Sequence, residues 1–301
     1  NLLQAQEIPP LEDFFGKIRQ ALDEPIGSLP LKDIVKPGEQ ILIIISDITR
    51  PVKSEQYMPI LVDYLNKAGI EDKDIKILVA TGSHREATKE EIGRLLGHEL
   101  AGRLHVLSNR AGVVEDFVDL GMTTRGTPVK INRLAVQADH VIMTGGIGFH
   151  FLAGFSGGRK SILPGIVAQE SIQANHSLVL DARGKVRQGL MDGNPIAEDM
   201  WEAAAMLNPS FLLNVVLNDR GEPAGVFAGD WNKAHRAGCR FANSCFGISV
   251  EEKRPLVIAG AGGFPKDLNL YQSAKGLLNA MEVVAEGGTV IFVAECREGI
   301  G

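Results

Sequence analysis

Short apolar runs recur along the chain, and each is followed by polar or glycine residues and then by a helical pattern. Their near-continuous Ile, Val and Leu content predicts strands buried on both faces of a parallel sheet. The predicted strands are Ile41–Ser46, Ile75–Ala80, Arg103–Leu107, His140–Thr144, Phe211–Leu217, Val257–Ala259 and Thr289–Val293. Helical periodicity lies between them, over Ser54–Ala68, Lys89–Leu96, Pro128–Ala138, Ile196–Leu207 and Trp231–Phe246.

This alternation predicts two α/β domains with mainly parallel, Rossmann-like sheets and an active site in the cleft between them. A charged segment at Ser249–Arg254 follows a long helical stretch and precedes a fresh strand. We therefore expect residues 1–250 to form an N-terminal catalytic and cofactor-binding domain, and residues 251–301 to begin a C-terminal domain. The first residue is Asn1 and the last residues follow a strand, so both ends look trimmed.

Charge and composition exclude some classes of partner. The net charge of −6 argues against a nucleic-acid partner, which would demand a basic face. No apolar run approaches the roughly 18–20 residues of a membrane helix, and no signal peptide is visible. The three cysteines have no metal-like spacing, which favours reduced thiols and a cytoplasmic protein.

Polar side chains gather where predicted strands end, which is where ligands bind in a parallel α/β sheet. The segments that follow four strands are Asp47-Ile48-Thr49-Arg50-Pro51, Thr81-Gly82-Ser83-His84-Arg85, Gly145 to His150, and Gly260 to Pro265 with Tyr271 to Lys275 after it. Each has an ordinary alternative, since a lone histidine after a strand is often a surface or capping residue. His98, His105, His140 and His235 are interpreted in that way. His98-Glu99 is not a zinc-protease motif, because Gly102 stands where a second histidine is required.

The stretch from His150 to Ser161 (HFLAGFSGGRKS) carries the strongest signal. It resembles a phosphate-binding P-loop, but Arg159 replaces a glycine and Pro164 would break the helix that must follow. A nucleoside triphosphatase is therefore not expected. A glycine-rich turn that carries Arg159 and Lys160 still suits an anionic cofactor, because bare backbone N–H groups can approach a phosphate closely.

At these residues the sequence resembles the nickel-dependent lactate racemase family, which acts on 2-hydroxy acids. The matching pieces are Asp47 to Pro51, Thr81 to Arg85, His150 to Gly165, Asn175-His176 and Tyr271 to Lys275. They keep the order and approximate spacing of the family and cover nearly the whole chain. The most specific is His-x₉-Lys within HFLAGFSGGRK, followed sixteen residues later by His176.

The resemblance implies a nickel-pincer nucleotide, pyridinium-3,5-bisthiocarboxylic acid mononucleotide, which is absent if its synthesis enzymes are absent. It implies that Lys160 binds this cofactor covalently and that His176 is a nickel ligand, which suits square-planar Ni(II). Further residues implied for the cofactor are Asp47, Ile48, Thr49, Arg50, Gly157 and Gly158. Those implied for the substrate are Arg50, Gln272 and Lys275.

By the same resemblance, His84 and His150 form the acid–base pair of a 2-hydroxy-acid racemase or epimerase. Hydride transfer avoids a carbanion beside a carboxylate, and two bases on opposite faces serve both directions of the reaction. The expected partners are a small 2-hydroxy acid and the cofactor-synthesis enzymes. Two other readings stay open: a metal-dependent hydrolase with histidine ligands, and a nucleotide- or phosphate-binding protein without catalysis.

Overall fold

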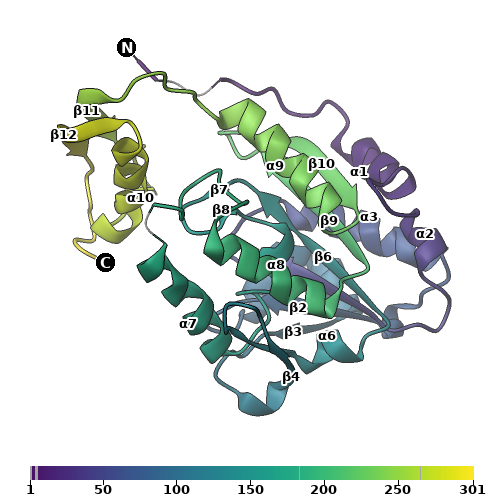
Figure 1. Ribbon diagram of the computed structural model, residues 1–301. Coiled ribbons are helices and arrows are strands. Elements are labelled where there is room, and N and C mark those ends of the chain that lie inside the picture. The colour runs from purple at the N-terminus through teal and green to yellow at the C-terminus, as the bar shows by residue number, and fades with distance from the viewer. Residues whose placement is uncertain (1, 4–5, 183, 265) are drawn as a thin grey trace. The chain divides into compact units, whose positions relative to one another are not determined.

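The computed structural model describes residues 2–3, 6–182, 184–264 and 266–301. The chain divides into a large unit, Gln6–Phe246, and a small unit that contains Gly247–Gly301. In Figure 1 the large unit runs from purple to green, and the small unit is yellow-green to yellow. Each unit contains its own parallel strand pairing.

The large unit is built on a six-stranded sheet with the order β10-β9-β6-β1-β2-β3. Its strands are β1 (Ile41–Ser46), β2 (Ile75–Ala80), β3 (His105–Ser108), β6 (His140–Ile147), β9 (Phe211–Leu217) and β10 (Pro223–Gly229). Neighbouring strands are parallel except β9 and β10, which are antiparallel. The predicted α/β class with a mainly parallel sheet is confirmed.

The strand β1 shows why its sequence is apolar throughout. Ile41, Ile43 and Ile45 belong to one hydrophobic core, whereas Leu42 and Ile44 belong to another. Successive side chains of a strand point to opposite faces of the sheet. A strand covered by helices on both faces therefore needs an unbroken apolar run rather than an alternating one.

Helices cover both faces of this sheet (Figure 1). Residues of the first core come from α1 (Phe14–Asp23), α2 (Leu31–Ile34), α3 (Ser54–Lys67), α4 (Lys89–Leu96) and α5 (His98–Arg103). Residues of the second core come from α6 (Arg133–Gln137), α7 (Gln169–Ser177), α8 (Pro195–Leu207) and α9 (Lys233–Phe246). Short 3₁₀ helices lie at η1 (Asp72–Asp74), η2 (Val114–Asp116), η3 (Gly158–Ser161) and η4 (Leu178–Asp181).

The helix expected over Pro128–Ala138 is wrong in its first half. Pro128–Asn132 is a strand, β5, which pairs antiparallel with β4 (Phe117–Met122). Val129 and Ile131 alternate with polar residues and enter the second core, which is the period of a half-buried strand. The Asn132 side chain then accepts a hydrogen bond from the Leu134 N–H and caps α6.

The small unit has one strand–helix–strand repeat. The strand β11 (Arg254–Gly260) pairs in parallel with β12 (Val284–Val293), and α10 (Leu270–Met281) connects them. Asn269 caps α10 by accepting a hydrogen bond from the Gln272 N–H at 2.9 Å. This unit therefore repeats, on a small scale, the parallel α/β arrangement of the large one.

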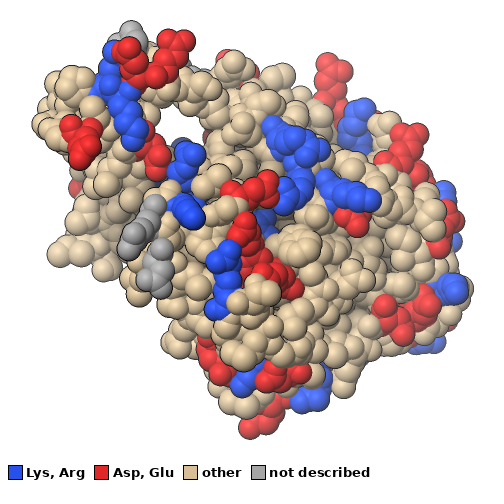
Figure 2. All heavy atoms as spheres, viewed as in Figure 1, with Lys and Arg blue, Asp and Glu red and all other residues tan. Residues whose placement is uncertain are grey.

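The surface carries charges of both signs. Figure 2 shows Lys and Arg interspersed with Asp and Glu on the face in view, a distribution unlike the single-sign stripe of a nucleic-acid-binding surface. Within the described ranges, no helix combines the length and the apolar character needed to cross a membrane.

Asn194 offers a test of how the large unit is held together. Its buried amide accepts hydrogen bonds from the Ile196 and Ala197 N–H groups at the start of α8, and donates to the Leu152 and Leu190 carbonyls. We expect Asn194→Ala to lower the free energy of unfolding by about 2–4 kcal/mol, because it removes a cap and leaves buried groups unpaired.

Thr88→Ala is the matched control, because Thr88 caps α4 with a single exposed hydrogen bond to the Glu91 N–H. Its cost should be about 1 kcal/mol. Urea unfolding of the two variants measures the difference, and equal costs would contradict the role assigned to Asn194.

Candidate active site

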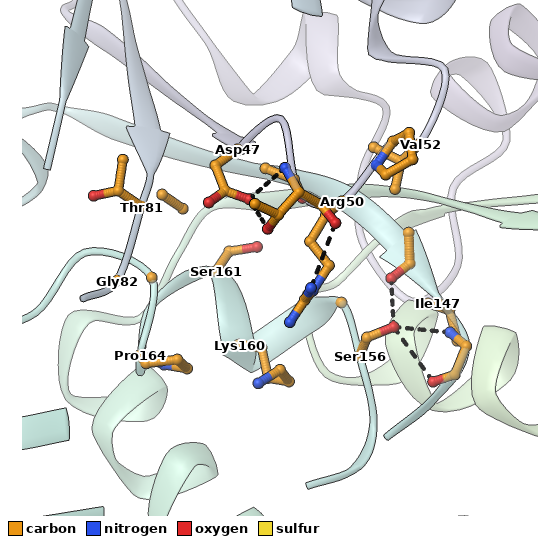
Figure 3. A pocket seen from close by; sticks show the side chains of 18 of the residues that line it. Asp47, Arg50, Val52, Thr81, Gly82, Ile147, Ser156, Lys160, Ser161 and Pro164 are labelled. Atoms are coloured by element: carbon orange, nitrogen blue, oxygen red, sulfur yellow. Dashed lines mark hydrogen bonds between the residues drawn. The ribbon is translucent and has the colours of Figure 1, made fainter. Parts of the chain in front are cut away.

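A cavity of about 370 Å³ lies at the carboxyl ends of the parallel strands (Figure 3). Its walls are the segment after β1, the segment after β2, the end of β6, and the glycine-rich stretch with η3. This is where a parallel α/β sheet binds ligands. Three of the four expected segments thus meet in one cavity, and the fourth, after β11, belongs to the small unit.

Asp47 and His84 form a hydrogen-bonded pair at this edge. Ser46 of β1 pairs with Ala80 of β2, so the turns that follow these strands start side by side. Asp47 Oδ2 lies 2.6 Å from His84 Nδ1. Asp47 Oδ1 accepts hydrogen bonds from the N–H and the hydroxyl of Thr49. Asp47 is buried and His84 is about half exposed, with 52% of its side chain accessible.

The other expected residues of this turn have different positions. Thr49 and Arg50 line the cavity, and the Arg50 guanidinium hangs into it in Figure 3. Ile48 instead packs against the first hydrophobic core and is not among the residues that line the cavity. The turn therefore presents polar groups to the cavity while one apolar side chain anchors it to the sheet.

The glycine-rich turn has its shape because two glycines sit where no side chain fits. Both adopt positive φ angles, +72° at Gly157 and +52° at Gly158. A Cβ atom on Gly157 would lie 2.6 Å from Asn214 Oδ1, and one on Gly158 would lie 2.4 Å from the His235 ring. The Gly158 N–H donates to Asn214 Oδ1 at 2.8 Å. The buried side chains of Asn214 in β9 and His235 in α9 thus fix the conformation of the turn.

Lys160 follows this turn and lines the cavity. Burial disfavours its charged form, and the charges of Arg50 and Arg159 add to that effect, which lowers its pKa to about 7. A large share of Lys160 is therefore a neutral amine at neutral pH, and a neutral amine is nucleophilic. Strongly shifted pKa values of this kind gather at functional sites.

Arg159 faces the other way. Its buried guanidinium donates to the Ala197 and Ala153 carbonyls and lies 3.4 Å from His235 Nδ1. It stands in the wall of a second cavity, of about 360 Å³, and does not line the first. Of the two cations expected to serve an anionic cofactor, only Lys160 reaches the site.

His150 lies in a hairpin formed by β7 (Phe149–His150) and β8 (Gly154–Phe155). Its Nδ1 accepts hydrogen bonds from the N–H groups of Leu152 and Ala153, at 3.2 and 3.1 Å. Burial, followed by the charges of Lys160 and Arg50, lowers the pKa of His150 to about 2. His150 is therefore a neutral imidazole at neutral pH.

His176 lies near the end of α7 and is partly buried. Burial and then the Lys160 charge lower its pKa. The Lys160 charge also lowers the pKa of His150, so the three side chains lie close enough to affect one another electrostatically. Asn175 fixes α7 here, because its amide donates to Asp199 and to the Ile196 carbonyl.

Gln272 and Lys275 belong to the small unit. Both lie on α10, and Lys275 Nζ donates a hydrogen bond to Gln272 Oε1 at 2.6 Å. They therefore present an amide and an ammonium group together, one turn apart on the same helix face.

Three buried residues that support the site were not selected from the sequence. Asn214 interrupts the apolar strand FLLNVVL, and that single polar residue was the available signal. His235, interpreted from the sequence as an ordinary histidine, is buried and lies 2.9 Å from the Ser156 carbonyl through Nε2. Asn194 caps α8 and also holds the His150 hairpin, because its amide donates to the Leu152 carbonyl.

The donor set limits what metal this site can take. Among the residues that the structure describes, no three His, Cys, Asp or Glu side chains form a group able to hold a metal ion. A hydrolytic zinc site needs about three protein ligands, so a histidine-ligated hydrolase is not supported. The His176 imidazole close to the neutral Lys160 amine fits a metal that arrives with its own organic ligands.

Comparison with known proteins identifies the family of the chain. The family described as "Lactate racemase N-terminal domain" matches residues 1–187, and "Lactate racemase C-terminal domain" matches residues 250–301. The lactate racemase of Thermoanaerobacterium thermosaccharolyticum is 39% identical over 286 residues, and that of Lactiplantibacillus plantarum is 39% identical over 284. Each alignment covers 94% of this chain, which spans 66% of the length of either relative.

A solved structure gives the same answer. The lactate racemase apoprotein from Thermoanaerobacterium thermosaccharolyticum superimposes with a TM-score of 0.88 at 36% identity, over 99% of this chain and 76% of that one. The resemblance read from the motifs is confirmed, and the chain belongs to the lactate racemase family.

Proposed function

We propose that this chain carries the cofactor-binding and acid–base groups of a racemase or epimerase, an isomerase that acts on a 2-hydroxy acid, with lactate as the first candidate. The observation that carries the proposal is one cavity that combines a Lys160 amine of pKa about 7 with a His84 imidazole held by Asp47. Relatives named lactate racemases support the same reaction.

The cofactor that suits this cavity is the nickel-pincer nucleotide. Lys160 would hold it covalently through a thioamide, and His176 would supply an imidazole to nickel. When bound, the cofactor would accept and return the hydride of the substrate α-carbon. The fit rests on the neutral Lys160 amine, on the His176 imidazole close to it, and on the lack of a three-ligand group among the described residues.

The remaining cofactor contacts would come from the two turns. Gly157 lines the cavity without a side chain, which lets a phosphate or ring approach the backbone. The Gly158 N–H is already bonded to Asn214, so this glycine would serve by giving the turn its shape. Asp47, Ile48, Thr49 and Arg50 would bound the other wall, with Ile48 acting as an anchor in the core.

The proposed acid–base pair is His84 and His150. His84 Nε2 would take the hydroxyl proton of one enantiomer, and Asp47 would stabilise the resulting imidazolium. Burial lowers the pKa of His150, and the charges of Lys160 and Arg50 lower it further, so that His150 is neutral. A bound anion would counter those charges and make it easier for His150 to carry a proton.

Arg50 would hold the substrate carboxylate, since a guanidinium offers two parallel donors to one carboxylate. Gln272 and Lys275 would add an amide and an ammonium group from the small unit. Fixing the carboxylate would prevent the oxo acid from tumbling freely in the site before hydride returns to it.

Residues 1–250 would be the catalytic and cofactor-binding domain and residues 251–301 the beginning of a C-terminal domain. The partners would be a small 2-hydroxy acid and the cofactor-synthesis enzymes, without nucleic acid or membrane. The cytoplasm is the expected compartment.

Covalent attachment at Lys160 can be tested by mass. Wild type co-expressed with cofactor-synthesis enzymes should gain mass and bind nickel, and Lys160→Ala should lose both because the attaching amine is gone. Lys89→Ala removes an exposed lysine at the start of α4 and should behave as wild type. Intact-protein mass spectrometry with nickel analysis gives both readouts.

A Lys160→Ala protein that keeps the added mass would contradict the assignment of Lys160. An unmodified wild type, beside a known racemase that is loaded in the same cells, would instead favour the non-catalytic binding protein.

The pKa of Lys160 can be measured in the protein without cofactor. Because the neutral amine is the reactive form, acetylation of Lys160 should rise through about pH 7 and then level off. Acetylation of an ordinary exposed lysine rises toward pH about 10.4. Arg50→Ala removes a charge that lowers this pKa, so its midpoint should move to higher pH.

Arg85→Ala is the control for that shift, because Arg85 is exposed and paired with Glu91. Peptide mapping after brief labelling gives each rate. A Lys160 rate that still climbs steeply above pH 9, about two units past the expected midpoint, would rule out the lowered pKa.

A further inference from the structure

The two proposed acid–base histidines are hydrogen-bonded at the same ring atom, but with opposite polarity. His84 Nδ1 faces a carboxylate oxygen of Asp47 at 2.6 Å. His150 Nδ1 faces two N–H donors, those of Leu152 and Ala153. A neutral imidazole has one N–H and one bare nitrogen, and its neighbours decide which is which.

Around His84, every contact favours a proton on Nδ1. Asp47 Oδ1 is already occupied by the N–H and the hydroxyl of Thr49, and Oδ2 is left for the imidazole. A carboxylate accepts hydrogen bonds and donates none. His84 must therefore donate from Nδ1, which leaves Nε2 bare.

Around His150, the contacts favour the reverse. Backbone N–H groups can only donate, so Nδ1 must be bare and the proton must sit on Nε2. The turn that carries these N–H groups is fixed: the Leu152 carbonyl accepts from Asn194, and the Ala153 carbonyl accepts from Arg159 at 2.6 Å.

Gly154 restricts the turn further. Its φ angle is +74°, and a Cβ atom there would lie 2.1 Å from the Leu190 carbonyl oxygen. The N–H of Gly189 also donates to the Gly154 carbonyl. Backbone packing on this side prevents the hairpin amides from turning away from the His150 ring.

We propose that Asp47 and the hairpin amides of Leu152 and Ala153 hold His84 and His150 in opposite tautomers, so that the resting site presents one proton acceptor and one proton donor. His84 offers a bare Nε2, and His150 offers Nε2–H. Asp47 is then a positioning residue, which acts through His84 rather than on the substrate.

The catalytic meaning of this arrangement rests on the proposed function. The hydroxyl proton of one enantiomer passes to His84 Nε2: the O–H bond breaks, the N–H bond forms, and the electron pair stays on the substrate oxygen. His150 can take a proton at Nε2 only after its own proton has left that atom. Moving it to Nδ1 means giving up two backbone hydrogen bonds.

The tautomers can be read directly by NMR on the protein without cofactor, labelled with ¹⁵N-histidine, at neutral pH. Two-bond ¹H–¹⁵N couplings distinguish the two neutral forms, and His84→Gln and His150→Gln assign the signals. We expect Nδ1–H at His84 and Nε2–H at His150. The same tautomer at both positions, or the two reversed, would overturn the proposal.

Asp47→Ala isolates the cause. Without the carboxylate, His84 should move toward Nε2–H, while His150 should keep its signal and so serve as the control within the same spectrum. An unchanged His84 tautomer in a folded Asp47→Ala protein would show that Asp47 does not set it. The wild-type spectrum tests the opposite tautomers even if this variant fails to fold.

Activity provides a second, separable readout. In protein loaded with cofactor, Asp47→Asn should lower kcat by roughly 10²–10⁴-fold with a smaller change in KM, as expected when a base is left in the wrong tautomer. An Asp47→Asn enzyme with unchanged kcat would contradict the positioning role. Opposite tautomers in a loaded wild type without racemase activity would leave the tautomers standing and refute the proposed function.

Discussion

The parallel, in-register pairing of β1 with β2 and β6 is the constraint on which the site depends. Ser46 pairs with Ala80, and Ile44 with Met143, so the turns after all three strands leave the sheet at one edge. Asp47 and His84 are 37 residues apart in sequence but 2.6 Å apart in space. The strands that position Asp47 and His84 are themselves fixed by the apolar side chains that they bury in the two cores.

The glycine-rich turn is a second constraint on the site, because it directs two neighbouring cationic side chains to opposite sides. Arg159 turns into the interior, where carbonyl oxygens satisfy its guanidinium without a carboxylate. Lys160 turns into the cavity, where the same positive charge helps to lower its pKa. The pKa of Lys160 therefore depends in part on Arg159, after burial and Arg50, because removing the Arg159 charge would make the amine more basic.

Much of this could be predicted from the sequence, and the failures have physical reasons. Continuous apolar runs marked the buried strands, whereas β10 (PAGVFAG) is rich in Gly and Ala and carried no such signal. The strand β5 runs directly into α6, so its short alternation of apolar and polar residues is hard to separate from the helical pattern, and its pairing with β4 is not encoded locally. His84, Lys160 and the DITR turn were found by motif. The supporting roles of Asn214 and His235 depend on residues about 56 and 79 positions away, which no local pattern encodes.

The low pKa of Lys160 has a consequence for the chain while this amine is unmodified. An ammonium group is inert toward electrophiles, whereas a neutral amine reacts with aldehydes and acylating metabolites. The Lys160 amine lines a cavity of about 370 Å³, where a small carbonyl compound that enters could react with it. Acylation there would block the amine, so under the proposed function early attachment of the cofactor would also protect Lys160 from chemical damage.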